Sequence, residues 1–106
     1  MGKLNYNLDG RLEREIISQA KIFGLKKLIL FGSRARGTNR ERSDIDLAAA
    51  GGDVFSFAEA VNENVQTLLS FDVVNFDEIV DENFQAEIER DGIILYESVC
   101  AAVKKF

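Results

Sequence analysis

The sequence predicts one domain of the α/β or α+β class, in which helices flank a small mixed β-sheet. Short apolar runs that suit strands alternate with longer segments whose apolar residues recur every three or four positions. This alternation is typical of helices packed over one or both faces of a sheet. A chain of 106 residues can build one hydrophobic core but not two domains. We therefore expect residues 1–106 to form a single domain.

The first half of the chain is expected to form one helix and two strands. Apolar residues at helical spacing follow Asp9, a suitable N-cap, and Gly24 marks the end of this helix. Residues 27–31 are a short apolar run typical of a buried strand. Residues 43–50 alternate between polar and apolar types, so their side chains would face opposite sides of the sheet in turn.

The second half is expected to form two helices, two strands and a tail. Asp53 can cap a helix whose apolar residues recur from Val54 to Leu68. The following segments are predicted to be a strand, a helix, a strand and an apolar tail: Phe71–Phe76, Asp81–Asp91, Ile93–Tyr96 and Ser98–Phe106. The tail has helical spacing and could pack on the domain or on a partner. Five phenylalanines are expected to pack in the core and not to stack on bases: Phe31, Phe57, Phe71, Phe76 and Phe84.

Charge and composition narrow the possible ligands and locations. The net charge is −5, yet residues 26–42 carry six basic side chains and one acid, which leaves −10 for the remainder. Such a surface repels long nucleic acids, although the basic segment can meet a compact polyphosphate or simply be a solvated loop. No run approaches the roughly 18 apolar residues of a membrane span, and a signal peptide core is lacking, so a cytoplasmic location is expected. The single cysteine, Cys100, and the absence of histidine exclude a Cys/His zinc site within the chain.

The strongest chemical signal is a pair of carboxylates, Asp44 and Asp46, on one face of a predicted strand. Like charges this close repel, and a divalent cation offsets the repulsion; magnesium prefers such oxygen ligands. If Asp72 lies on the neighbouring strand, it completes a three-acid cluster able to hold two ions. Upstream, Gly32 and Ser33 end an apolar run at a turn whose amides and hydroxyl can donate to a phosphate.

Other interpretations of the Asp-x-Asp pair and of the Gly-Ser turn fit the sequence less well. An Asp-x-Asp pair alone can be an exposed strand end. An aspartyl-phosphate phosphatase would need a hydroxyl residue in place of Ala48, and an EF-hand loop would need further acids and a glycine. No Gly-Lys-Ser/Thr motif follows the turn, so it is not a P-loop. Arg34 and Arg36 can pair with phosphate or with a partner's carboxylate, and we favour Arg34 for nucleotide contact.

These residues resemble those of a known family. Gly32-Ser33, Gly37 and residues 43–47 match the Gly-Ser and Asp-x-Asp signature of the nucleotidyltransferase superfamily, and most closely its polymerase-β-like minimal nucleotidyltransferases. Residues 71–74 are similar to the strand that carries the third carboxylate, and residues 92–97 to the last strand. The resemblance covers most of the chain. It implies a nucleotidyltransferase fold in which the Gly-Ser turn leads into a short helix between the first two strands.

The resemblance also implies an activity and a partner. It implies magnesium-dependent transfer of a nucleotide, AMP from ATP, with two Mg²⁺ ions. Mapped by motif, the catalytic and metal-binding residues are Asp44, Asp46 and Asp72, and the nucleotide-binding residues are Gly32, Ser33 and Arg34. Minimal nucleotidyltransferases are often paired with HEPN-domain toxins, which implies an antitoxin that modifies its partner protein. Two alternatives stay open, namely a non-catalytic module that neutralises its partner by contact, and transfer to a small molecule such as an aminoglycoside. An oligomer is also possible.

Overall fold

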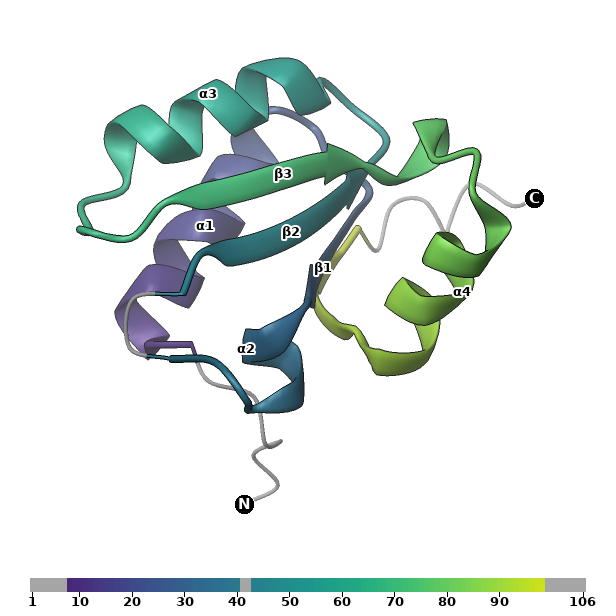
Figure 1. The fold of residues 1–106 in the computed structure, drawn as a ribbon. Helices are drawn as coiled ribbons and strands as arrows, with labels where there is room; N and C mark the ends of the chain where they lie inside the picture. The colour runs from purple at the N-terminus through teal and green to yellow at the C-terminus, as the bar shows by residue number, and fades with distance from the viewer. Residues whose placement is uncertain (1–7, 41–42, 99–106) are drawn as a thin grey trace.

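The computed structural model describes residues 8–40 and 43–98 as a four-stranded mixed sheet with helices on both faces (Figure 1). Its elements in chain order are α1 (Gly10–Ile22), β1 (Lys27–Phe31), α2 (Ser33–Arg36), β2 (Ile45–Ala50), α3 (Val54–Asn64), β3 (Phe71–Asn75), the 3-10 turn η1 (Phe76–Glu78), α4 (Glu82–Asp91) and β4 (Ile93–Glu97). The predicted fold class is confirmed.

The strand order places the predicted acids near the middle of the sheet. The order is β3-β2-β1-β4, with β1 antiparallel to both of its neighbours and β2 parallel to β3. Helix α3 makes the crossover between the two parallel strands, as such connections require. In register, Phe31 lies opposite Asp46, and Asp46 lies opposite Asp72. These three residues therefore form one row across β1, β2 and β3.

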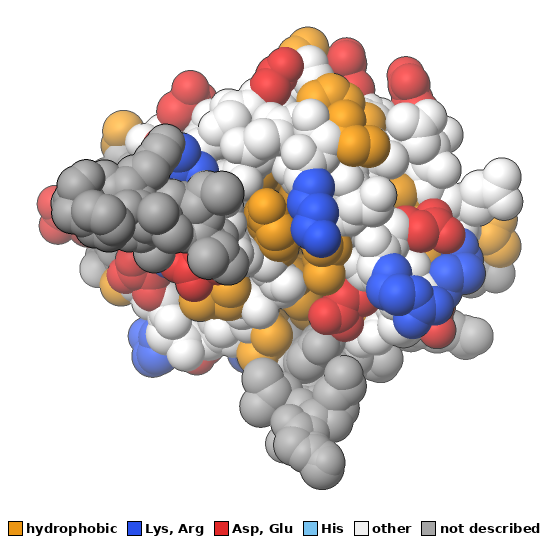
Figure 2. All heavy atoms as spheres, turned by 180° about the vertical axis from the view of Figure 1, so that it is seen from behind, with side chains coloured by type: hydrophobic (Ala, Val, Ile, Leu, Met, Phe, Trp, Pro, Cys, Tyr) orange, Lys and Arg blue, Asp and Glu red, His pale blue; other side chains and the backbone are white. Residues whose placement is uncertain are grey.

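The main hydrophobic core lies on the back face of the sheet, beneath α1 and α3. Ile16 of α1, Leu47 of β2 and Phe57 of α3 are each fully buried there. Alternate residues of β2, namely Ile45, Leu47 and Ala49, belong to this cluster, which matches the predicted alternation of that strand. Figure 2 views the molecule from this side, where hydrophobic side chains reach the surface in small areas between polar and backbone atoms.

The front face carries a smaller apolar cluster and remains partly open. Ile88 of α4 packs with Ile29 of β1 and Ala48 of β2, and half-buried side chains of η1 and α4 surround them. This cover does not enclose the end of the sheet where β1 finishes and where β2 and β3 begin. Asp72 at that end is exposed and Asp46 is half-buried. The fold thus leaves the predicted acids accessible from the front.

The predicted cap at Asp53 is confirmed and Asp81 also caps a helix, whereas Asp9, at the start of α1, makes no side-chain cap hydrogen bond. Asp53 accepts a hydrogen bond from the Ser56 N–H at 3.1 Å, and Asp81 accepts one from the Asn83 N–H at 2.9 Å. The expected extension of the first of these helices to Leu68 is wrong, because α3 ends at Asn64. The chain then becomes extended, and Leu68 is 95% exposed.

Two predictions lie outside the described residues, namely the helical tail beyond Ser98 and the environment of Cys100. Within residues 8–40 and 43–98, no helix is both long and apolar enough to cross a membrane.

Candidate active site

The register of the sheet brings two predicted carboxylates together. Asp46 and Asp72 are direct partners on the parallel strands β2 and β3, so both side chains lie on the front face. Asp46 is half-buried, whereas Asp72, on the edge strand, is exposed. On the other side of Asp46, Phe31 occupies the last position of β1. The expectation that the third acid would lie on a neighbouring strand is met.

Asp44 lies just outside β2, which corrects the predicted start of that strand. The strand begins at Ile45, and Ser43 is hydrogen-bonded to Arg40 and Arg34. The Ser43 N–H donates to the Arg40 carbonyl at 3.1 Å, and the Arg40 N–H donates to the Ser43 hydroxyl at 2.8 Å. The Ser43 carbonyl accepts hydrogen bonds from the Arg34 guanidinium. Asp44 is exposed, and the pleat of the strand does not fix its direction.

The Gly-Ser turn lies directly against Asp46. Gly32 has φ 76° and ψ −156°, a backbone conformation essentially restricted to glycine. A Cβ added to Gly32 would collide with a carboxylate oxygen of Asp46. Ser33 begins α2, and the Arg36 N–H closes this short helix by donating to the Gly32 carbonyl at 3.2 Å. A phosphate held at this turn would therefore face a carboxylate at close range, and that pairing requires a cation between them.

The electrostatics of Asp46 support the same requirement. Burial raises the pKa of the Asp46 carboxyl above its ordinary value, and the negative charges of Asp72 and Asp44 raise it further. Arg36 and, to a smaller extent, Arg34 oppose this rise in the pKa. Burial and the two acids together outweigh the arginines, so ionising Asp46 costs free energy that a bound cation would offset.

The residues fit a magnesium ion by chemistry but do not form a ready-made site. Three carboxylates are suitable oxygen donors, and the absence of a Cβ at Gly32 lets the Asp46 carboxylate lie directly against the turn. Within the described part of the chain, however, no three acidic, cysteine or histidine side chains converge closely enough to hold an ion. Metal binding would therefore require Asp44 or Asp72 to reorient, and both are exposed and have space to do so.

Comparison with known proteins decides the family. The family described as "Polymerase beta, Nucleotidyltransferase" matches residues 14–99, a range that includes the Gly32 turn and all four described strands. The chain belongs to this nucleotidyltransferase family. A search of the curated proteins finds no significant match.

Solved structures share the fold of this nucleotidyltransferase domain at low sequence identity. A chain of a toxin–antitoxin structure with AMP-PNP aligns with a TM-score of 0.66 and 23% identity, covering 84% of this chain and 76% of that one. A mutant of the toxin–antitoxin MntA-HpeT gives 0.65 and 21%, with the same shares covered. A candidate minimal nucleotidyltransferase gives 0.61 and 24%, covering 76% of this chain and 86% of that one. The predicted nucleotidyltransferase fold is confirmed.

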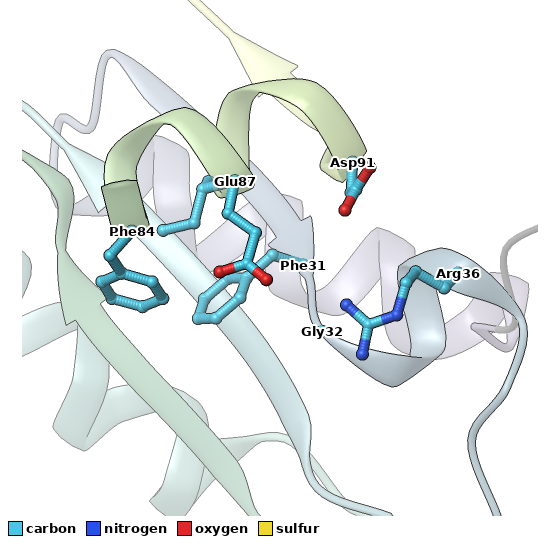
Figure 3. A pocket seen from close by; sticks show the side chains of 7 residues that line it. Phe31, Gly32, Arg36, Phe84, Glu87 and Asp91 are labelled. Carbon is cyan, nitrogen blue, oxygen red and sulfur yellow. The ribbon is translucent and has the colours of Figure 1, made fainter. Parts of the chain in front are cut away.

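The two arginines after the turn have different surroundings in this nucleotidyltransferase domain. Arg34 is only 6% exposed, and its Nε and Nη2 atoms donate to the Ser43 carbonyl at 3.2 and 3.0 Å. It therefore ties α2 to the turn that precedes β2. Arg36 is exposed, and Figure 3 shows its guanidinium turned toward Gly32. Because it also has the larger effect of the two on the pKa of Asp46, Arg36 is the better placed to meet a phosphate.

A cavity of about 160 Å³ lies between the Gly32 turn and α4. Its lining residues are Phe31, Gly32, Arg36, Phe84, Glu87, Ile88 and Asp91 (Figure 3). The rings of Phe31 and Phe84 meet edge to face, with centroids 5.8 Å apart. Sequence reasoning assigned both rings to the core and did not mark α4 as part of a site. No local pattern could have found it, because the cavity joins residues more than fifty positions apart.

Proposed function

We propose that this domain transfers a nucleotide from a nucleoside triphosphate, with ATP as donor and Mg²⁺ as cofactor, to a hydroxyl of a partner protein. The observation that carries the proposal is the packing of the Asp46 carboxylate against Gly32, with Asp72 beside it on the next strand. A phosphate-binding turn and a pair of acids in one small space suit a metal-bound triphosphate and few other ligands.

In this proposal Asp44, Asp46 and Asp72 hold the metal. Mg²⁺ would neutralise the phosphate charge that these acids otherwise repel. Ser33 and the backbone around Gly32 orient the triphosphate, so that the acceptor oxygen can approach the α-phosphorus in line with the leaving group. The new bond forms between that oxygen and the α-phosphorus, the bond to the bridging oxygen breaks, and pyrophosphate leaves. Asp72 lies on the open edge of the site, where it can take the proton of the acceptor hydroxyl.

We assign different roles to the two arginines that follow the Gly-Ser turn. Arg36 is the residue that we assign to the triphosphate, because its guanidinium lies near Gly32 and lowers the pKa of Asp46. Arg34 is committed to the Ser43 carbonyl and supports the site by fixing the position of the residue before Asp44. Arg34 would therefore act on nucleotide binding through the geometry of the acids.

The partner in this proposal is a HEPN-type toxin, which makes the chain the antitoxin of a pair. Support comes from the shared fold with chains of toxin–antitoxin structures, one of them with AMP-PNP, an analogue of ATP. The open front face beside Asp72 leaves room for an acceptor that belongs to another protein. Neutralisation by contact alone is the second candidate, and the absence of a ready-made three-acid metal site among the described residues favours it.

Calorimetric titration of ATP and GTP, with and without Mg²⁺, tests the proposal directly. We expect ATP to bind only with the metal, and the Asp44→Asn/Asp46→Asn double variant to lose this binding. Incubation with the partner should then add the mass of AMP to the partner for the wild-type protein and not for the double variant. If the double variant silences the partner fully, and neither it nor the wild-type protein adds mass to the partner, the chain acts by contact neutralisation and not by transfer.

A further inference from the structure

The cavity beside the Gly32 turn contains apolar side chains and a carboxylate that the proposed binding of phosphate and metal does not involve. Its walls are mainly apolar, formed by the edge-to-face pair Phe31 and Phe84 and by the buried Ile88. Figure 3 shows the Glu87 carboxylate beside the two rings. Asp91 at the rim is already paired with Arg90 at 3.1 Å. Glu87 has no hydrogen bond or ion pair within the described residues, although its negative charge acts on Arg90 at longer range. Glu87 is thus available to a ligand.

The size and charge of the cavity favour a flat, uncharged ring with hydrogen-bond donors. Pockets for whole drug-sized ligands measure roughly 300–1,000 Å³, so a cavity of about 160 Å³ holds only a part of a nucleotide. The carboxylate of Glu87 repels phosphates, and the apolar walls favour an aromatic ring over a ribose. A carboxylate accepts hydrogen bonds and cannot donate them when ionised, so it pairs with an amine. A nucleobase with an exocyclic amine has all of these properties.

The position of the cavity indicates that the nucleotide, and not the acceptor, occupies it. Asp46 lies in one row between Phe31, which lines the cavity, and Asp72, on the exposed edge strand. An acceptor activated by Asp72 would approach from that edge and meet the reacting phosphate on the side away from the cavity. The rest of the nucleotide then has the space beside Gly32, which borders both the turn and the cavity.

We propose that this cavity binds the base of the nucleotide and that Glu87 accepts a hydrogen bond from its exocyclic amine, the 6-amino group of adenine in ATP. The proposal rests on the proposed function, since it places the base of the same donor. Glu87 then determines which base is bound. The Phe31 and Phe84 rings contact the base and also belong to the front-face cluster.

The test compares ATP with purine riboside triphosphate, which lacks the amine, in Mg²⁺-containing calorimetric titrations of the full chain. Loss of a hydrogen bond to a charged group lowers affinity by about tenfold or more, so the wild-type protein should prefer ATP by about that factor. Glu87→Met removes the carboxylate at similar length and should bring the preference close to one. Glu89→Met removes the same charge from the same helix but outside this cavity, and it should keep the wild-type preference.

Inorganic triphosphate serves as a probe of the phosphate site alone. We expect Glu87→Met to bind it as well as the wild-type protein does. Suppose that ATP binding depends on Asp46 and that Glu87→Met still prefers ATP over purine riboside triphosphate by the wild-type factor. That result would overturn the base assignment and leave the proposed function intact. If Glu87→Met instead impaired only transfer to the partner, the cavity would be an acceptor site and the assignment would again fail. Absence of metal-dependent binding of any triphosphate would reject both proposals.

Discussion

The two faces of the sheet differ in how they combine stability and chemistry. On the back face, α1 and α3 enclose a continuous cluster in which Ile16, Leu47 and Phe57 are fully buried. On the front face, the described residues bury only Ile29, Ala48 and Ile88 in a separate cluster, and Asp46 and Asp72 lie beside it. A buried apolar face provides most of the free energy of folding in a domain of this size. The front face can therefore carry charges that oppose folding.

This division makes stability and function separable by mutation. A change on the back face should lower the free energy of unfolding without altering the chemistry of the folded molecules that remain. A change among the front-face acids should alter binding or transfer while leaving the fold intact or more stable. The intermediate case is Arg34 of α2, which is buried and yet positions Ser43, next to the acids.

The largest effect on stability is expected on the back face. Phe57→Ala removes a fully buried ring and should lower the free energy of unfolding by about 3–5 kcal/mol. Phe55 is on the same helix but 73% exposed, so Phe55→Ala should change it by less than about 0.5 kcal/mol. Urea unfolding followed by circular dichroism measures both. Equal losses in the two variants would contradict the assignment of the core to the back face.

The second prediction contrasts the two arginines after the turn. Arg34→Met leaves the Ser43 carbonyl without its charged donor and should cost about 2–3 kcal/mol of stability. Arg36→Met should leave the unfolding transition nearly unchanged and weaken Mg²⁺-ATP binding by about tenfold. Thermal unfolding and calorimetry on the same two proteins separate these effects. The opposite pattern, with Arg36 needed for stability and Arg34 for binding alone, would support Arg34 as the nucleotide contact, as predicted from the sequence.

The order and type of the elements could be predicted because each has a local signal. Glycines and capping aspartates separate the segments, and Asp53 accepts the predicted cap hydrogen bond, although Asp9 does not. The errors arise where contacts distant in the sequence override a local pattern. The predicted start of β2 is Ser43, which is hydrogen-bonded to Arg34, and apolar spacing continues past the end of α3 to Leu68 although that side chain is exposed.

The candidate site could be predicted only in part. Motif spacing identified Gly32, Asp46 and Asp72; the strand register pairs Asp46 with Asp72, and Gly32 packs against the Asp46 carboxylate. The different environments of the two arginines depend on tertiary contacts, since both have the same chemistry and lie two positions apart. The cavity beneath α4 depends on how that helix packs on β1, and no residue spacing encodes this.

A third prediction tests the contact between the turn and Asp46. Gly32→Ala places a Cβ against the Asp46 carboxylate and forces alanine into a conformation suited to glycine. The backbone strain alone should cost about 1–3 kcal/mol, and the displaced carboxylate should reduce metal-dependent ATP binding. Gly10→Ala is the control, because Gly10 begins α1 and a Cβ there would make only ordinary contact, with Arg14 at 3.6 Å. A Gly32→Ala protein with normal stability and binding would refute this contact.

The fourth prediction concerns Asp46→Asn, for which we expect a small gain in stability that sharpens the contrast between the two faces. Burial and the neighbouring acids raise the pKa of the Asp46 carboxyl in the folded state above its ordinary value of 3.8. The folded protein therefore binds this proton more tightly than the unfolded chain does, and the wild-type protein loses stability as the pH rises from 3.8 through the raised pKa. Above that range the penalty is constant, and at lower pH it disappears.

Asp46→Asn removes this titration, so the variant should exceed the wild-type protein in stability at pH 7 by up to about 1 kcal/mol, since solvent partly screens the site. The difference should vanish near pH 3, and saturating Mg²⁺ should reverse it by stabilising only the wild-type protein. Unfolding curves at the two pH values, with and without the metal, measure this. A variant less stable than the wild-type protein at pH 7 without metal would mean that the carboxylate stabilises the front face. The two faces would then share the task of folding, and the acids would no longer stand out as groups retained for chemistry at a cost in stability.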